Sequence, residues 1–127
     1  MPSLNRVQLI GRLGKDPESR QTPKGTRYTT FSLAVDHRWK DNTGEAHQET
    51  DWFNVEAWGK VGEICQNYLT KGKLVYLEGR LRTRKYEHEG STRYFTTVVL
   101  STLQMLEKKA KEPLLEEGEE IAEETAE

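Results

Sequence analysis

The amino-acid sequence predicts an all-β domain: a five-stranded barrel with one short helix between the third and fourth strands. Three observations lead to this prediction. Apolar and polar residues alternate along five stretches, which is typical of half-buried strands. One stretch changes to the spacing of an amphipathic helix. The 127 residues fit one domain, with turn residues between the stretches.

The composition restricts the class of protein. Charged residues make up 31% of the chain and hydrophobic residues 34%, which favours a water-soluble domain with a modest core. No apolar run approaches the roughly 20 residues of a membrane-spanning helix, and the N-terminus lacks the pattern of a secretory signal. The only cysteine, Cys65, cannot form an internal disulfide. We therefore expect a cytoplasmic protein.

The charge is distributed unevenly. Residues 107–127 contain nine acidic residues and three lysines, whereas residues 1–106 contain 16 basic and 12 acidic residues. A mildly basic body favours polyanionic partners, although an excess of this size is common. We predict a folded domain over residues 1–106 and an acidic tail over 107–127. The tail has too few apolar residues to offset the entropy of ordering, so we expect disorder, with a short helix as the alternative.

The first strand is predicted over Arg6–Leu13. Its inward face consists of alternate residues: Val7, Leu9, Gly11 and Leu13. Glu18–Gln21 is expected to be a short extended piece between two turns. The second strand is predicted over Tyr28–His37. The following stretch, Arg38–Glu49, has no periodicity and contains the turn sequence Asp41–Gly44, so we expect a long hairpin loop.

The third strand, Asp51–Trp58, has two different faces. Phe53, Val55 and Ala57 form its core face. The opposite face, which we expect to meet solvent, consists of Trp52, Asn54, Glu56 and Trp58. Two exposed indoles indicate a contact surface, either for protein or for the bases of a nucleic acid.

A helix follows the third strand. Its predicted apolar face consists of Val61, Ile64, Cys65, Tyr68 and Leu69. We expect Cys65 to pack as a small hydrophobic residue, and Gly72 to cap the C-terminus of the helix.

Two long strands complete the prediction. The fourth, Lys73–Tyr86, turns alternate apolar residues inward and places Arg80, Arg82, Arg84 and Tyr86 on the opposite face. Arg93–Leu106 is the fifth. This order of elements is that of an OB-fold, a Greek-key barrel. A β-sandwich with one incidental helix remains the alternative.

No arrangement for catalysis or metal binding stands out. His47-Gln48-Glu49 matches half of a zinc deaminase signature, but the required pair of cysteines is missing. His37, His47 and His88 lack the spacing of metal ligands, so we expect solvated surface histidines. We therefore predict a protein that is not an enzyme and needs no cofactor or metal.

The positive signal is a set of aromatic residues interleaved with basic ones. Four aromatic residues fall on polar strand faces or in loops: Trp39, Trp52, Trp58 and Tyr86. Arg82 and Arg84 share the face of Tyr86. A base stacked on an aromatic ring contributes roughly 1–3 kcal/mol whatever its identity. Because a duplex hides the faces of its bases, this pattern favours single strands.

Several motifs of the chain occur together, and in the same order, in one family. They are Asn5-Arg6-Val7, Gly11–Glu18, Trp58-Gly59-Lys60, Tyr68–Gly72, Val75–Tyr86 and Gln104-Met105-Leu106. Through them the chain closely resembles bacterial single-stranded DNA-binding proteins over about residues 4–106.

The resemblance implies an OB-fold that assembles as a homotetramer and wraps single-stranded DNA. The stacking residues of the family correspond to Trp39, Trp52, Trp58 and Tyr86. Its basic, phosphate-contacting positions correspond to Arg6, Lys60, Lys71, Arg82, Arg84 and Lys85. Lys85 does not share the strand face of Tyr86. Tyr76 is assigned to a subunit contact.

The resemblance also implies a role in DNA replication, recombination and repair, at the nucleoid in the cytoplasm. Family members recruit replication and repair proteins through an acidic tip that ends in Pro-Phe. This chain ends Ala122–Glu127 without Pro-Phe, which argues against recruitment through such a tip. Two other readings remain: a binder of single-stranded RNA, and a primosome-type interaction module whose aromatic face contacts protein.

Overall fold

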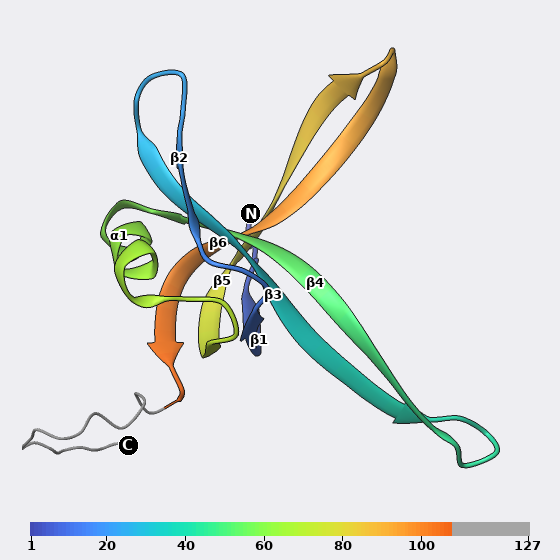
Figure 1. The fold of residues 1–127 in the computed structure, drawn as a ribbon. Coiled ribbons are helices and arrows are strands. Elements are labelled where there is room, and N and C mark those ends of the chain that lie inside the picture. Colours follow the sequence, from blue (N-terminus) through green and yellow to red (C-terminus); the bar gives the residue numbers. More distant parts are fainter. Residues whose placement is uncertain (108–127) are drawn as a thin grey trace, which may run out of the picture.

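The structure, a computed structural model, describes residues 1–107 and contains six strands and one helix in that range (Figure 1). The elements are β1 (Val7–Leu13), β2 (Glu18–Gln21), β3 (Arg27–Lys40), β4 (Ala46–Trp58), α1 (Gly59–Tyr68), β5 (Leu74–His88) and β6 (Ser91–Met105). The predicted tail lies outside the described residues except for Glu107. The carboxylate of Glu107 pairs with Arg12 at 2.8 Å.

Five of the strands close into a barrel. The sheet has the order β1-β5-β6-β4-β3-β2, and β1 also pairs with β3, which closes the ring. Only the β4–β6 pair is parallel among the described strands. The short strand β2 is the predicted extended piece and pairs with β3. The predicted OB-fold with its single helix between the third and fourth barrel strands is confirmed.

The core lies inside the barrel and beneath α1. Its buried residues are Leu13, Phe31, Leu33, Val55, Ala57, Cys65, Leu69, Val75, Leu77, Val98 and Leu100. Cys65 packs among them as predicted, and its burial raises the pKa of the thiol to about 11. At Gly79 an added Cβ would lie 2.2 Å from the backbone oxygen of Val99, so β5 and β6 approach too closely for any side chain there.

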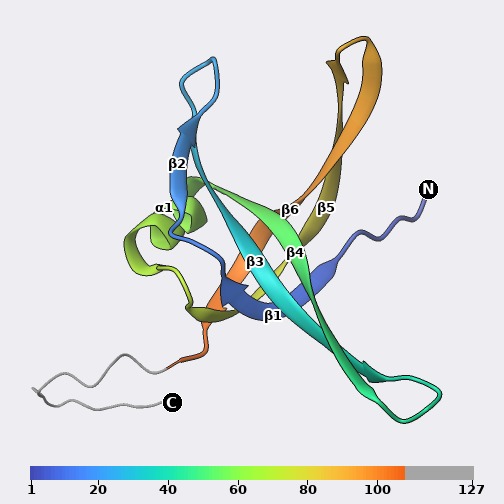
Figure 2. The same cartoon turned by 45° about the vertical axis from the view of Figure 1, so that its right-hand side comes forward.

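Three hairpins extend beyond the barrel (Figures 1 and 2). The β2–β3 hairpin and the outer parts of β5 and β6 project on the same side, and we call the latter the β5–β6 arm (residues 80–99). The outer parts of β3 and β4 form a third ribbon, the β3–β4 arm (residues 36–50), which points the other way.

The prediction of a long loop over Arg38–Glu49 was wrong. Strands β3 and β4 stay paired as far as Lys40 and Ala46, which leaves a turn of only 41–45. Most residues of this arm are exposed on both faces, so no apolar periodicity marks them as strand. Backbone pairing extends the ribbon beyond the part that a hydrophobic pattern can reveal.

The end of the helix also differs from the prediction. The helix ends at Tyr68, and Leu69 takes the C-cap position, so Gly72 is not the cap. Gly72 instead has a φ of 88° in the turn that leads into β5. Tyr68, which was expected on the apolar face, is 57% exposed, whereas Cys65 and Leu69 are buried in the core. No helix in the described part of the chain is long and apolar enough to cross a membrane.

Candidate nucleic-acid interface

One outer face of the barrel brings together half of the predicted site residues. Cross-strand partners share a face, and Trp58 lies opposite Tyr28, while Trp52 lies opposite Ala34. On the neighbouring strands, Arg84 is the partner of Phe95. We call this surface the groove face. It consists of Tyr28, Ser32, Trp52, Asn54, Glu56, Trp58, Arg82, Arg84, Tyr86, Phe95 and Thr97.

The two tryptophans of β4 are held differently. Trp52 is 60% exposed and lies over Gly14, where an added Cβ would be 2.5 Å from the indole ring. Trp58 is half-buried and stacks on Tyr28, with ring centroids 4.3 Å apart. Its indole N–H also donates to Oε2 of Glu56 at 2.6 Å. Trp52 therefore offers an open ring face, whereas Trp58 is fixed in a stack.

Glu56 was expected to meet solvent, and this was wrong: its residue exposure is 2%. The hydroxyl of Thr97 donates to Oε1, and Arg84 donates to Oε2 at 3.0 Å. Burial raises the pKa of Glu56, but the hydrogen bonds from Trp58, Thr97 and Arg84 lower it by more, so the net shift is downward. The structure thus holds a carboxylate beneath the groove face, and that carboxylate orients Trp58 and Arg84.

A groove of about 340 Å³ opens beside this carboxylate. It lies between the β2–β3 hairpin and the β5–β6 arm, the two projections on one side of the barrel in Figure 1. Its lining includes Lys15, Asp16, Glu18, Arg20, Tyr28, Thr30, Ser32, Asn54, Glu56, Arg84, Phe95 and Thr97. The groove thus combines aromatic, amide, hydroxyl and charged groups.

The predicted basic residues are not all brought together. Arg82 is exposed on the β5–β6 arm and forms no ion pair within residues 1–107. Arg84 is anchored to Glu56. Lys85 is paired with Tyr94 on the other face of the arm. Lys60 is exposed in the first turn of α1, and Lys71 is exposed in the turn before β5.

Tyr86 and Trp39 lie farther out. Tyr86 is 45% exposed on the β5–β6 arm, opposite Arg93. Trp39 lies on the β3–β4 arm, at a strand position whose parity is opposite to that of Tyr28. Its indole stacks on His37 and His47, with centroid distances of 5.2 and 5.3 Å. Both histidines lie at the surface as predicted, and they also pack against the Trp39 indole.

The turn at the end of the β3–β4 arm has its own polar cluster. Asp41, Glu45 and His47 have ligand-type atoms within 4.8 Å of one another. Asp41 accepts hydrogen bonds from His47 and Thr43 and from the backbone N–H of Glu45. These bonds lower its pKa to about 2. The cluster is therefore explained by turn geometry.

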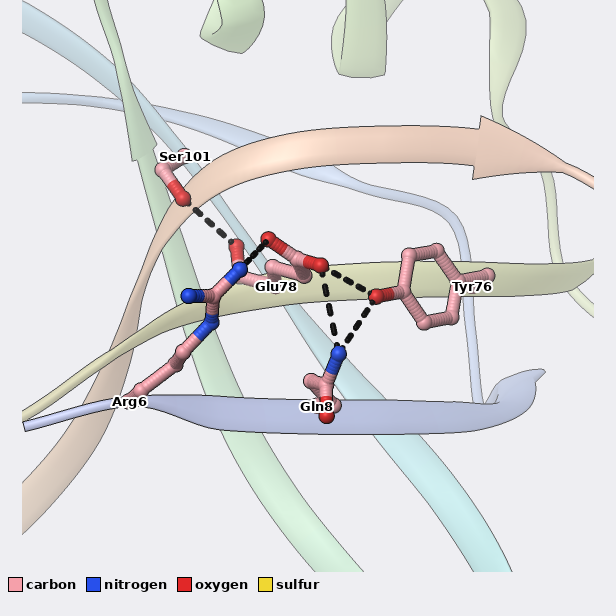
Figure 3. A network of polar contacts seen from close by, with 5 residues as sticks. All are labelled: Arg6, Gln8, Tyr76, Glu78 and Ser101. Atoms are coloured by element: carbon pink, nitrogen blue, oxygen red, sulfur yellow. Dashed lines mark hydrogen bonds and ion pairs between the residues drawn. The ribbon is translucent and has the colours of Figure 1, made fainter.

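Arg6 belongs to a different surface, the Glu78 network (Arg6, Gln8, Tyr76, Glu78 and Ser101). Figure 3 shows it on β1, β5 and β6, with Arg6 directly before β1. Arg6 pairs with Glu78 at 3.1 Å, and the hydroxyl of Tyr76 donates to the same carboxylate. Gln8 donates to the hydroxyl of Tyr76 at 3.0 Å. The predicted subunit contact of Tyr76 stays a prediction.

Two aromatic residues of the groove face were missed in the sequence. Tyr28 is identified only by its register opposite Trp58, which a single strand does not reveal. Phe95 follows another aromatic residue, Tyr94, so alternation alone does not say which of them faces the groove. Glu56, Arg84 and Thr97 also meet only through pairing of distant strands.

Comparison with known proteins identifies the family. A sequence model described as the single-strand binding protein family matches residues 4–106. The chain belongs to this family. It is 44% identical over 108 residues to single-stranded DNA-binding protein 1 of Chlorobaculum tepidum, covering 84% of this chain and 67% of that protein. It is 45% identical over 105 residues to the single-stranded DNA-binding protein of Neisseria meningitidis serogroup A, covering 82% of this chain and 60% of that protein.

Solved structures agree with this assignment. A Plasmodium falciparum SSB in complex with ssDNA matches with a TM-score of 0.77 and 34% identity, covering 84% of this chain and 98% of that one. A deletion mutant of the single-stranded DNA-binding protein from Thermus aquaticus matches with a TM-score of 0.73 and 31% identity, covering 84% of this chain and 52% of that one. The match to the curated Neisseria relative leaves about two fifths of that protein outside the alignment.

Proposed function

We propose that this protein binds and protects single-stranded DNA, largely without sequence preference, during DNA replication, recombination and repair. The observation that carries the proposal is the open indole of Trp52 on the same face as the Trp58–Tyr28 stack and the arginines of β5. Stacking tolerates any base, and cations beside the rings pair with phosphates.

The aromatic residues divide into three contact points. Trp52 and Trp58 lie six residues apart on β4, roughly 20 Å, so they would take two bases of one strand that are several nucleotides apart. Tyr86 continues the surface along the β5–β6 arm. Trp39 is the proposed contact on the β3–β4 arm, where a strand leaving the barrel would meet the exposed part of the indole.

Whether a cation can contact a phosphate depends on whether a carboxylate already pairs with it. Arg82, Lys60 and Lys71 are exposed and are the simplest candidates. Arg6 and Arg84 already pair with Glu78 and Glu56, so a phosphate must share or replace a carboxylate there. Lys85 reaches DNA only if the strand wraps around the arm.

The family supports a proposal for the assembly and the cellular setting. We propose a homotetramer that acts in the cytoplasm at the nucleoid and has no catalytic activity. Replication and repair proteins are its expected neighbours on DNA. The relatives named above are single-stranded DNA-binding proteins, which supports this proposal.

Binding to a dye-labelled oligo(dT), followed by fluorescence anisotropy, tests the proposal. We expect saturable binding that weakens as salt rises, and much weaker binding to a duplex of the same length. Trp52→Ala should weaken binding, whereas Trp52→Phe, the matched control, should retain most of it. Absence of binding at low salt would contradict the proposal and favour an interaction module whose aromatic face contacts protein.

A further inference from the structure

The groove between the β2–β3 hairpin and the β5–β6 arm has the size of a small-ligand site. Its volume of about 340 Å³ lies at the lower end of the range for such sites. Asn54 and Ser32 are cross-strand partners on its floor. Their amide and hydroxyl groups can both donate and accept hydrogen bonds. A planar, polar-edged group would therefore find partners there.

The charges that line the groove balance one another. Three cations and three carboxylates line it: Lys15, Arg20, Arg84, Asp16, Glu18 and Glu56. Arg20 pairs with Glu18 at 2.8 Å, and Lys15 approaches the same carboxylate at 3.9 Å. Arg84 pairs with the buried Glu56. A phosphate group gains little in such surroundings, because each cation already has a partner. A neutral nucleobase suits the groove better.

Phe95 supplies an open ring on this groove. It is 44% exposed although it lines the hollow, and its cross-strand partner is Arg84. The guanidinium of Arg84 is anchored to Glu56 on the floor. The next residue along the chain, Tyr94, is 67% exposed and is paired with Lys85 on the other face of the arm. Of these two neighbouring aromatic residues, only Phe95 lines the groove.

We propose that this groove is a nucleobase subsite, in which one base of the bound single strand stacks on Phe95 and hydrogen-bonds through its edge with Asn54 and Ser32. The inference rests on the proposed function and adds to it a stacking residue and the place of one base. On the groove face, exposed cations outside the groove would then bind phosphates, and the groove itself would bind a base.

The test compares Phe95→Ala with Tyr94→Ala in the full chain, with binding to oligo(dT) measured over a range of salt concentrations. Loss of one stacked base should weaken binding about fivefold or more. The slope of log affinity against log salt should stay unchanged, because stacking releases no counterions. Tyr94→Ala should bind like the wild type, and Phe95→Tyr should restore most of the affinity. Circular dichroism confirms that each variant is folded.

A second measurement does not depend on any variant. An oligonucleotide carrying 5-iododeoxyuridine is irradiated on the wild-type protein, and the cross-linked peptide is sequenced by mass spectrometry. We expect a cross-link at Phe95 and none at Tyr94.

Failure of this inference is distinguishable from failure of the proposed function. If the wild type binds oligo(dT) but Phe95→Ala binds equally well and no cross-link forms at Phe95, the subsite is overturned while the function stands. If Phe95→Ala changes the oligomeric state without changing the affinity per chain, Phe95 belongs to a contact between copies of the chain. That outcome would also overturn the subsite. If the wild type does not bind, the proposed function itself fails.

Discussion

The two halves of strand β5 present different chemistry on the same side of the strand. In the first half, Tyr76 and Glu78 belong to the Glu78 network with Arg6 and Gln8 (Figure 3). In the second half, Arg80, Arg82 and Arg84 follow at the same two-residue spacing. Glu56 is the only acidic partner of these three arginines within residues 1–107. In the first half the charged groups are paired within the Glu78 network, whereas the second half leaves cations exposed.

The change occurs where β5 leaves the barrel. The pairing of β5 with β6 shifts between Glu78 and Gly79, and Ser101 is the residue of β6 without a partner. The hydroxyl of Ser101 donates to the backbone oxygen of Glu78. Such a bulge increases the local twist of a ribbon. Beyond it β5 runs on in the β5–β6 arm, so a single strand carries both a self-contained polar network and part of the groove face.

Glu56 and Glu78 also differ in how deeply they are buried. The residue exposure of Glu56 is 2%, whereas the side chain of Glu78 is 22% exposed. The pKa of each carboxyl is lowered by its hydrogen-bonding partners, with Tyr76 as the largest cause at Glu78. Water can replace the partners of an exposed carboxylate but not those of a buried one. We therefore expect the network beneath the groove face to be the more costly one to break.

The largest expected effect is on DNA binding by the groove face. Trp52→Ala combined with Trp58→Ala removes two stacking surfaces and should weaken binding to oligo(dT) by roughly 30-fold or more, at 1–3 kcal/mol per base. Gln8→Ala, on the Glu78 network, is the control and should bind normally. Fluorescence anisotropy measures both. Equal affinity of the double variant and the wild type would remove the stacking proposal.

Breaking the buried network should lower stability. Glu56→Ala leaves Trp58, Thr97 and Arg84 without their acceptor, and we expect a loss of about 2 kcal/mol in the free energy of unfolding. Denaturant unfolding followed by circular dichroism measures it. A variant as stable as the wild type would show that water or other side chains satisfy these donors.

The same glutamate should make stability depend on pH. Its pKa is lowered in the folded state, so its contribution is present at neutral pH and is lost as the pH falls below the ordinary range of a glutamate. Glu56→Gln lacks this contribution at every pH. The stability difference between wild type and Glu56→Gln should therefore shrink on acidification from pH 7 to pH 3. A stability difference that stays constant with pH would contradict a lowered pKa of Glu56 in the folded state.

The free and paired arginines should differ in their salt dependence. Arg82→Ala should reduce the slope of log affinity against log salt by about 1, as expected for one lost phosphate contact. Arg6→Ala should change it less, because Glu78 already holds that guanidinium. Titrations at four salt concentrations compare the two. An equal change of slope in both variants would show that the pairing with Glu78 does not withhold Arg6 from phosphate.

The smallest effect is expected in the Glu78 network. Glu78→Gln keeps the size of the side chain and can still hydrogen-bond with Tyr76, and the site is accessible to water. We expect a smaller loss of stability than in Glu56→Ala, and a small gain in affinity for oligo(dT) because Arg6 is released from its carboxylate partner. A larger loss would reverse the ranking of the two networks.

The sequence revealed the parts of the fold that have a periodic apolar face. The barrel strands and the helix were predicted because residues such as Val75 and Leu77 alternate with polar neighbours. The β3–β4 arm was missed because both its faces are mostly polar. At the site, the alternation of strand residues correctly placed Arg82 and Lys85 on opposite faces of β5. The buried position of Glu56, in contrast, depends on Thr97 and Arg84 from distant strands. No local pattern contains that information.

Intrinsic tryptophan fluorescence tests the central claim most directly, because each of the three tryptophans marks a different place. Two variants are titrated with unlabelled oligo(dT): Trp39→Phe with Trp58→Phe, which keeps only Trp52, and the matched protein that keeps only Trp39. If single strands bind the groove face, Trp52 emission should be strongly and saturably quenched, and a duplex should leave it unchanged. Binding confirmed by anisotropy without any change at Trp52 would contradict this placement of the DNA.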